Sequence, residues 1–120
     1  VVHFRGGDFS PENEVKLMQY YCAALRPFSH ATVVTNDAAR AKSFFEQVAP
    51  WLEIVIQTAS SELEDFAILS RARNLICSNS TFCWWAAEIC NGNVVQPNSF
   101  YAFPWEPKSL VQRKKIDTEK

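Results

Sequence analysis

The chain has 120 residues, with 12 basic and 13 acidic side chains and a formal net charge of −1. This length fits a single domain, and 48% hydrophobic and 21% charged residues exclude a disordered or fibrous protein. The near-zero charge argues against a nucleic-acid binder, which normally carries a basic excess. The sequence has no run of about 18 apolar residues, so no membrane-spanning helix is predicted. The chain lacks an initiator Met and starts inside an apolar run, so we expect it to be part of a longer protein.

Short apolar runs predict five strands, at residues 1–4, 31–35, 52–56, 75–77 and 94–95. Helical patterns separate them. Ser10-Pro11-Glu12 starts the first helix, which Arg26-Pro27 ends, and the second covers 38–48. Ser60-Ser61-Glu62 caps the third, and the fourth covers 81–90, before Asn91-Gly92-Asn93.

This alternation predicts an α/β fold, a Rossmann-like parallel sheet of about five strands flanked by helices. Such sheets bind ligands outside the carboxyl ends of their strands, which here lead into loops at 5–9, 36–37, 57–61 and 78–81. We expect one α/β domain over residues 1–99. Residues 100–120 read as a basic tail, in which Arg113-Lys114-Lys115 is expected to be a solvated end.

The four cysteines form no CxxC pair and lie far in sequence from the two histidines, so a zinc site is not expected. An even number of cysteines permits two disulfides. Because Cys77, Cys83 and Cys90 lie within apolar segments, small buried hydrophobic residues are the preferred interpretation.

The first loop combines Arg5 with two glycines, a pattern suited to gripping a phosphate through a planar fork of donors. Asp8 could hold that guanidinium or act on a substrate hydroxyl. A plain Arg–Asp surface pair closing a turn is the commoner alternative. His3 leaves the strand on the same face as Arg5, although a lone histidine on a strand is usually a satisfied core residue.

Two further segments suggest a ligand site. Ser80 or Thr81 caps a helix whose free N–H groups can bind an anion, whereas ordinary capping is the alternative. Three acids at 62–65 begin another helix. They either complement the helix dipole or place one carboxylate against a nucleobase edge. Their spacing does not decide between the two.

In this order, the segments resemble the donor-binding half of the fucosyltransferase superfamily, with the closest likeness to the α-1,2-fucosyltransferases. Residues 3–9 read His-Phe-Arg-Gly-Gly-Asp-Phe, similar to the family motif HxRRxD. Thr35-Asn36-Asp37 echoes a second block, and residues 65–70 echo a third. Residues 79–87 match N-S-T-F-S-W-W-A-A except at Cys83. This fourth block is the most specific, and the resemblance extends from residue 3 to about 97.

The resemblance implies the C-terminal, nucleotide-sugar-binding half of a GT-B glycosyltransferase that uses GDP-fucose as donor, inverts the anomeric centre and needs no metal or other cofactor. It implies that Arg5 contacts the diphosphate and that His3 and Asp65 hold the guanine and ribose region. Ser80 would donate to the β-phosphate, with Thr81 and Phe82 beside it at the helix N-terminus. The implied partners are a nucleotide sugar, a glycan acceptor and an N-terminal acceptor domain.

The catalytic base is expected to be Asp8, with Glu12 or Glu14 as the next choices. The second motif arginine is Gly6 here, which removes one cation from the diphosphate site. An inactive nucleotide-sugar-binding remnant is therefore the alternative. Localisation stays open. Eukaryotic Golgi enzymes that the chain resembles carry an N-terminal anchor upstream of such a domain, whereas bacterial and viral versions are cytoplasmic.

A phosphoacceptor receiver domain has this length and sheet but needs an acidic pair after the first strand, an Asp after the third and a Lys after the fifth. Asp8 stands alone after the first strand. Gln57-Thr58 follows the third strand and Gln96-Pro97 the fifth. The receiver interpretation therefore fails.

Overall fold

A computed structural model of the chain describes residues 1–5, 11–57, 61–97 and 113–116, without the side chains of residues 11–14, 113, 115 and 116. Strands and helices alternate through most of this length. The strands are β1 (Val2–Phe4), β2 (His30–Thr35), β3 (Glu53–Gln57), β4 (Asn74–Ile76), β5 (Asn93–Pro97) and β6 (Arg113–Ile116). The helices are α1 (Pro11–Leu25), α2 (Ala38–Val48), α3 (Glu62–Ser70) and α4 (Thr81–Ile89).

The described strands form one sheet in the order β3-β2-β1-β4-β5-β6, and every pair of neighbours is parallel. β1 lies inside the sheet and pairs with β2 on one side and, through Val2 and Ile76, with β4 on the other. The chain builds outward from β1 to β3, then crosses back to β4 and continues to β6. This is the doubly wound order of a Rossmann-like α/β fold.

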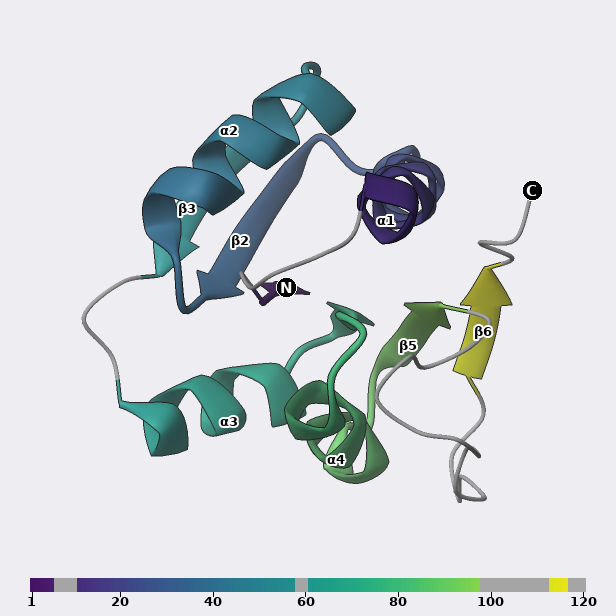
Figure 1. Ribbon diagram of the computed structural model, residues 1–120. Helices are drawn as coiled ribbons and strands as arrows, with labels where there is room; N and C mark the ends of the chain where they lie inside the picture. Colours follow the sequence, from purple (N-terminus) through teal and green to yellow (C-terminus); the bar gives the residue numbers. More distant parts are fainter. Residues whose placement is uncertain (6–10, 58–60, 98–112, 117–120) are drawn as a thin grey trace.

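The helices cover opposite faces of the sheet, with α1 and α2 on one side and α3 and α4 on the other (Figure 1). Each pair encloses its own core. The α1–α2 core holds a cluster of aromatic rings, which are Phe4, Tyr20, Tyr21, Phe44 and Phe45. The α3–α4 core is built from smaller residues, among them Leu69, Leu75, Cys77, Cys83 and Cys90. All four cysteines of the chain are free thiols, and Cys22 alone is half-buried.

Two tyrosines of α1 fix the inner strands. The Tyr21 hydroxyl donates to the backbone carbonyl of His3 at 2.6 Å, and the Tyr20 hydroxyl donates to that of Cys77 at 2.6 Å. Burial raises the pKa of both phenols, so both keep the protons that these bonds need. The carboxyl ends of β1 and β4 are therefore held by the same helix.

Short polar side chains begin the helices that follow β2, β3 and β4. Asp37 caps α2 by accepting from the backbone N–H of Arg40, and Ser61 caps α3 by accepting from that of Glu64. Ser80 caps α4 in the same way, accepting from the N–H of Cys83. Each cap satisfies a donor that the helix itself leaves unpaired, and so fixes where the loop stops and the helix begins.

The predicted strands and helices are confirmed to within about two residues, but the sheet has one more described strand than expected. The basic cluster of residues 113–115, which we expected to be a solvated end, belongs to this further strand, and its Lys114 side chain is exposed. Residues 113–116 form β6, which pairs with β5 from Val94↔Arg113 to Pro97↔Ile116. An edge strand accommodates charged residues because one of its sides is open to solvent, so the charge did not exclude a strand.

The surface carries large hydrophobic side chains that come from different elements. Within the described ranges, the exposed ones are Val15, Trp51, Val55, Leu63, Trp85 and Ile89. None of the helices that the structure describes combines the length and the apolar composition that a membrane crossing requires.

Gly92, between α4 and β5, is needed for close packing against the turn that precedes β4. A Cβ built at residue 92 would lie 2.2 Å from the carbonyl oxygen of Arg73 and 2.4 Å from that of Ala72. Because these are backbone atoms, Gly92→Ala is expected to lower the free energy of unfolding by about 1–3 kcal/mol. Asn91→Ala, at the exposed neighbouring position, should change it by less than about 0.5 kcal/mol. Equal urea-unfolding midpoints for the two variants would contradict this account.

Candidate functional site

A cleft of about 190 Å³ opens at the carboxyl ends of β1 and β2, next to the first turns of α3 and α4. Its walls combine a cation with carboxylates, a polar loop and an aromatic ring. The residues that line it are His3, Arg5, Thr35, Asn36, Glu62, Asp65 and Phe82. These residues come from four separate parts of the chain, and the doubly wound order brings them together where such folds bind ligands.

The charges enter the cleft from different elements. Arg5 directly follows β1 and is exposed, whereas Glu62 and Asp65 lie in the first turn of α3. A ligand that spans the cleft would therefore meet a guanidinium from the sheet and carboxylates from a helix. This arrangement suits a molecule that carries both an anionic group and hydrogen-bond donors.

The wall next to α4 is aromatic. The Phe82 ring lies 5.7 Å from the His3 ring and 5.6 Å from the Phe66 ring, centroid to centroid. Such a ring offers a flat apolar surface on which a planar group can stack. Thr81, one residue earlier, is exposed at the helix N-terminus and is not among the residues that line the cleft.

Behind this wall lies a chain of buried polar groups. The Nδ1 atom of His3 lies 2.5 Å from the Ser78 hydroxyl oxygen, which lies 2.8 Å from that of Ser80. The Ser80 oxygen in turn accepts from the backbone N–H of Cys83 at 3.3 Å. The cleft histidine is thus connected to the cap of α4.

The Cys83 thiol lies against the same groups and is fully buried. Burial acts to raise its pKa. Hydrogen bonds with the Cys77 and His3 side chains act in the opposite sense and favour the thiolate. The charge that His3 carries whenever its ring is protonated and a hydrogen bond from the Ser78 backbone add to them, and the pKa of Cys83 is lowered to about 6.

The site residues predicted from the sequence fall into four groups. His3, Arg5, Asp65 and Phe82 meet in the cleft. Ser80 has a buried side chain and is connected to His3 through the Ser78 hydroxyl group. Thr81 is placed at the surface of α4, outside the cleft lining. Asp8 lies outside the described residues, as do the side chains of Glu12 and Glu14, so the three candidate bases have no described position.

The structure adds residues that the sequence interpretation did not select. Thr35 and Asn36 line the cleft, whereas Asp37, the next residue, caps α2. An Asp directly before a helical segment is itself a capping signal and could have separated these roles. Glu62 lines the cleft together with Asp65. Ser78 carried no local signal, because its partner His3 is 75 positions away in the sequence.

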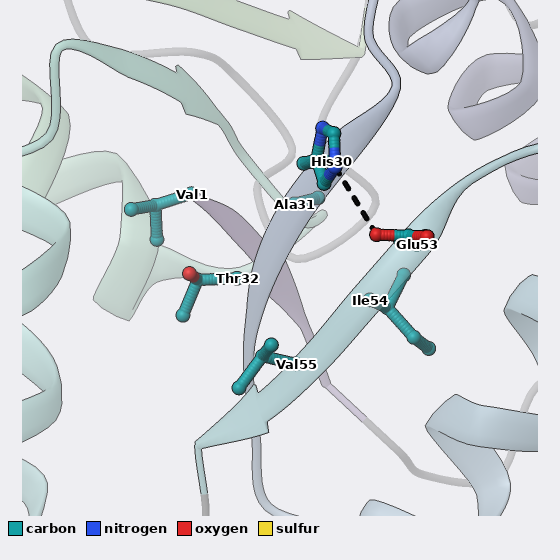
Figure 2. A pocket seen from close by; sticks show the side chains of 7 residues that line it. All are labelled: Val1, His30, Ala31, Thr32, Glu53, Ile54 and Val55. Carbon is teal, nitrogen blue, oxygen red and sulfur yellow. Dashed lines mark ion pairs between the residues drawn. The ribbon is translucent and has the colours of Figure 1, made fainter.

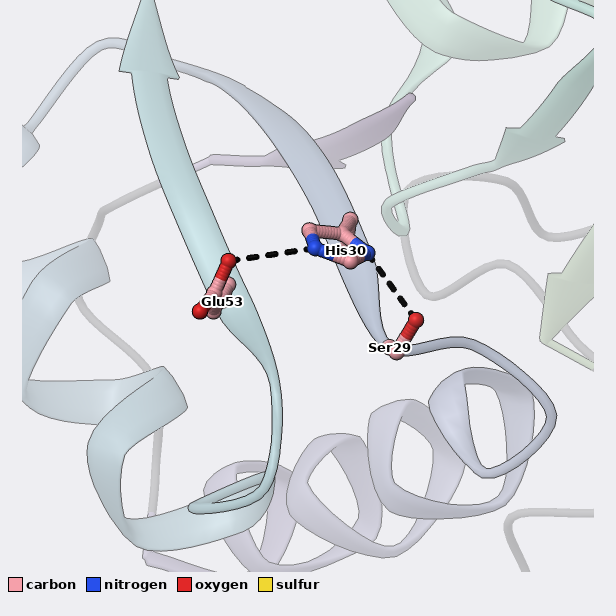
Figure 3. A network of polar contacts seen from close by, with 3 residues as sticks. All are labelled: Ser29, His30 and Glu53. Atoms are coloured by element: carbon pink, nitrogen blue, oxygen red, sulfur yellow. Dashed lines mark hydrogen bonds and ion pairs between the residues drawn. The ribbon is translucent and has the colours of Figure 1, made fainter.

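A second hollow, of about 530 Å³, lies near the opposite end of the sheet, along the first residues of β2 and β3 (Figure 2). Within it, His30 Nε2 lies 3.1 Å from a Glu53 carboxylate oxygen, and His30 Nδ1 lies 2.9 Å from the Ser29 hydroxyl (Figure 3). The His30 and Glu53 side chains are 74% and 81% exposed. Ion pairs this open to water contribute about 0–1 kcal/mol. Despite its size, the hollow is therefore a weaker candidate than the smaller cleft.

In the described part of the chain, no group of three or more His, Cys, Asp or Glu side chains is placed so that it could hold a metal ion. Comparison with protein-family models, with curated proteins and with solved structures finds no match to this chain.

The lowered pKa of Cys83 predicts a pH-dependent contribution to stability. A folded-state pKa of about 6, against 9.0 for an ordinary thiol, stabilises the fold fully above about pH 9. This contribution is lost as the pH falls through about 6. Since one pKa unit corresponds to about 1.4 kcal/mol, the stability difference between the parent and Cys83→Ser should shrink by at least about 1 kcal/mol over this range.

Urea unfolding of the parent and Cys83→Ser at about pH 6 and about pH 9 measures this difference. Cys22→Ser, which removes a different thiol, is the control variant. A gap between the parent and Cys83→Ser that is the same at both pH values would contradict the assignment of a thiolate to Cys83.

Proposed function

We propose that the chain is the GDP-fucose-binding half of a GT-B fucosyltransferase that works with inversion and without a metal. The observation that carries the proposal is the convergence of His3, Arg5, Asp65 and Phe82 in one cleft. All four of the sequence segments that resemble the family contribute residues to this cleft, although 60 positions separate Arg5 from Asp65.

The polarity of the cleft supports a guanine nucleotide. Guanine presents two adjacent N–H donors on one edge, and a carboxylate such as that of Asp65 can accept both. The diphosphate would lie toward Arg5 and the first turn of α4, whose unpaired N–H groups favour an anion. Sites that enclose a whole ligand commonly measure about 300–1,000 Å³. At about 190 Å³, the described walls would hold part of the nucleotide.

The chemistry that this site would perform is the neutralisation of a leaving group. As the bond between fucose and GDP opens, negative charge grows on the diphosphate, and Arg5 with the N-terminus of α4 would stabilise it. A hydroxyl of the glycan acceptor would attack from the opposite face of the sugar and invert its anomeric carbon. Asp8 is the first candidate for the base that takes the hydroxyl proton, and Glu12 or Glu14 the next.

Gly6 limits the strength of this site. In the family motif an arginine occupies this position, and the loss of one charged hydrogen-bonding group costs about 1.5–3 kcal/mol, or roughly one to two decades in rate. A nucleotide-sugar-binding remnant without transferase activity is therefore the second candidate. The two differ in whether an acceptor domain and measurable fucose transfer accompany the donor site.

Calorimetric titration with GDP tests the proposal. The chain should bind GDP in preference to UDP, and Arg5→Ala should weaken GDP binding by roughly tenfold to a hundredfold, since it removes a charged partner of the diphosphate. Arg26→Ala removes an exposed arginine at the far end of α1 and should leave the affinity unchanged. A folded parent chain that binds neither nucleotide, or that binds both equally, would reject the proposed donor site.

A further inference from the structure

The polar chain behind the cleft is closed off from water. His3, Ser78 and Ser80 are 7%, 3% and 2% exposed, and each lies within hydrogen-bonding distance of the next. Buried hydroxyl groups rarely leave their protons without a hydrogen-bond acceptor. The protons of Ser78 and Ser80 must therefore be donated to neighbouring members of this buried polar network. The direction of every hydrogen bond then follows from counting donors and acceptors.

The count begins at Ser80. Its oxygen already accepts from the backbone N–H of Cys83, which is a donor only. Among the described residues, its other hydrogen-bond partner is the Ser78 oxygen, so the Ser80 proton must be donated to Ser78. The Ser78 proton is then left for its remaining described partner, the Nδ1 atom of His3.

We infer that Ser78 and Ser80 are positioning residues, which hold His3 as the tautomer that carries its proton on Nε2. An imidazole whose Nδ1 accepts a hydrogen bond must carry its proton on the other nitrogen. The His3 backbone is fixed as well, because Tyr21 donates to its carbonyl group. The orientation and the tautomer of the ring are thereby both set from behind, and its Nε2–H is a donor for the Cys83 thiol or for an acceptor in the cleft.

The ionisable side chains around the His3 ring also favour a proton on Nε2. The ionisable side chains that share the cleft or the buried wall with His3 are Arg5, Glu62, Asp65 and Cys83. Three of these four are acids, which accept hydrogen bonds in their ionised form. A donor nitrogen on His3 is therefore favoured over a second acceptor.

This tautomer changes the role expected for Ser80 and defines what His3 can hold. The Ser80 proton is committed to Ser78, so Ser80 is not the phosphate donor that the sequence suggested. An anion at this corner would instead meet Arg5 and the backbone N–H groups of Thr81 and Phe82. His3 would face an oxygen acceptor of the ligand, such as a phosphate or ribose oxygen. This last step rests on the proposed nucleotide site, whereas the tautomer does not.

Long-range ¹H–¹⁵N spectra of the histidine rings test the inference directly, in the ligand-free chain at a pH of about 8, above the ordinary range of imidazole titration. The chain has two histidines, and the exposed His30 serves as an internal reference. The parent should show His3 protonated at Nε2. Ser78→Ala should shift it toward a mixture of tautomers, and Ser78→Thr, which keeps the hydroxyl, should restore the parent pattern. A parent protonated at Nδ1, or a Ser78→Ala variant with an unchanged tautomer, would overturn the inference.

GDP binding supplies the second measurement. Ser78→Ala should weaken it about threefold to tenfold, the effect of one lost hydrogen bond, while Ser78→Thr stays within about twofold of the parent. If Ser78→Thr fails to fold, the parent and Ser78→Ala spectra still decide the tautomer. A parent that shows the Nε2 proton but binds no GDP would reject the proposed function and leave the positioning role intact.

Discussion

The position of β1 inside the sheet is the constraint on which the rest of the structure depends. Its three residues pair with β2 on one side and reach β4 on the other, so this short strand joins the two halves of the sheet. Val2 and Phe4 pack into the α1–α2 core, and His3 points to the opposite face, toward Ser78 and Phe82. A slip by one residue would exchange these faces. The register of β1 thus fixes both the aromatic core and the histidine of the cleft.

The cleft follows from that arrangement. Because the chain runs outward from β1 in one direction and then returns to run outward in the other, the carboxyl ends of its central strands are left open beside the helices. Arg5 is delivered there by β1, Asp65 by α3 and Phe82 by α4. Ser80 links the packing to the site, since the same oxygen caps α4 and contacts the serine next to His3. Stability and ligand geometry would therefore change together if this cap were altered.

Local signals were sufficient for much of this structure. Ser61 and Ser80 cap helices as their positions before apolar segments predicted, and the alternation of strands and helices predicted the parallel sheet. Signals failed where a residue takes its role from a distant partner. Ser78 matters through His3, and β6 forms because the edge of β5 accepts it, which the basic sequence at 113–115 did not suggest. The spacing of Glu62 and Asp65 likewise could not show that both would face one cleft.

The central claim is that a guanine nucleotide occupies the cleft at the carboxyl ends of β1 and β2. Addition of GDP to the ¹⁵N-labelled chain, followed through its backbone amide resonances, tests this claim most directly. The account predicts that the largest changes cluster at His3, Asp65 and Phe82 and leave the hollow around His30 and Glu53 unaffected. Changes centred on His30 and Glu53, or no changes at millimolar GDP in a folded chain, would contradict it.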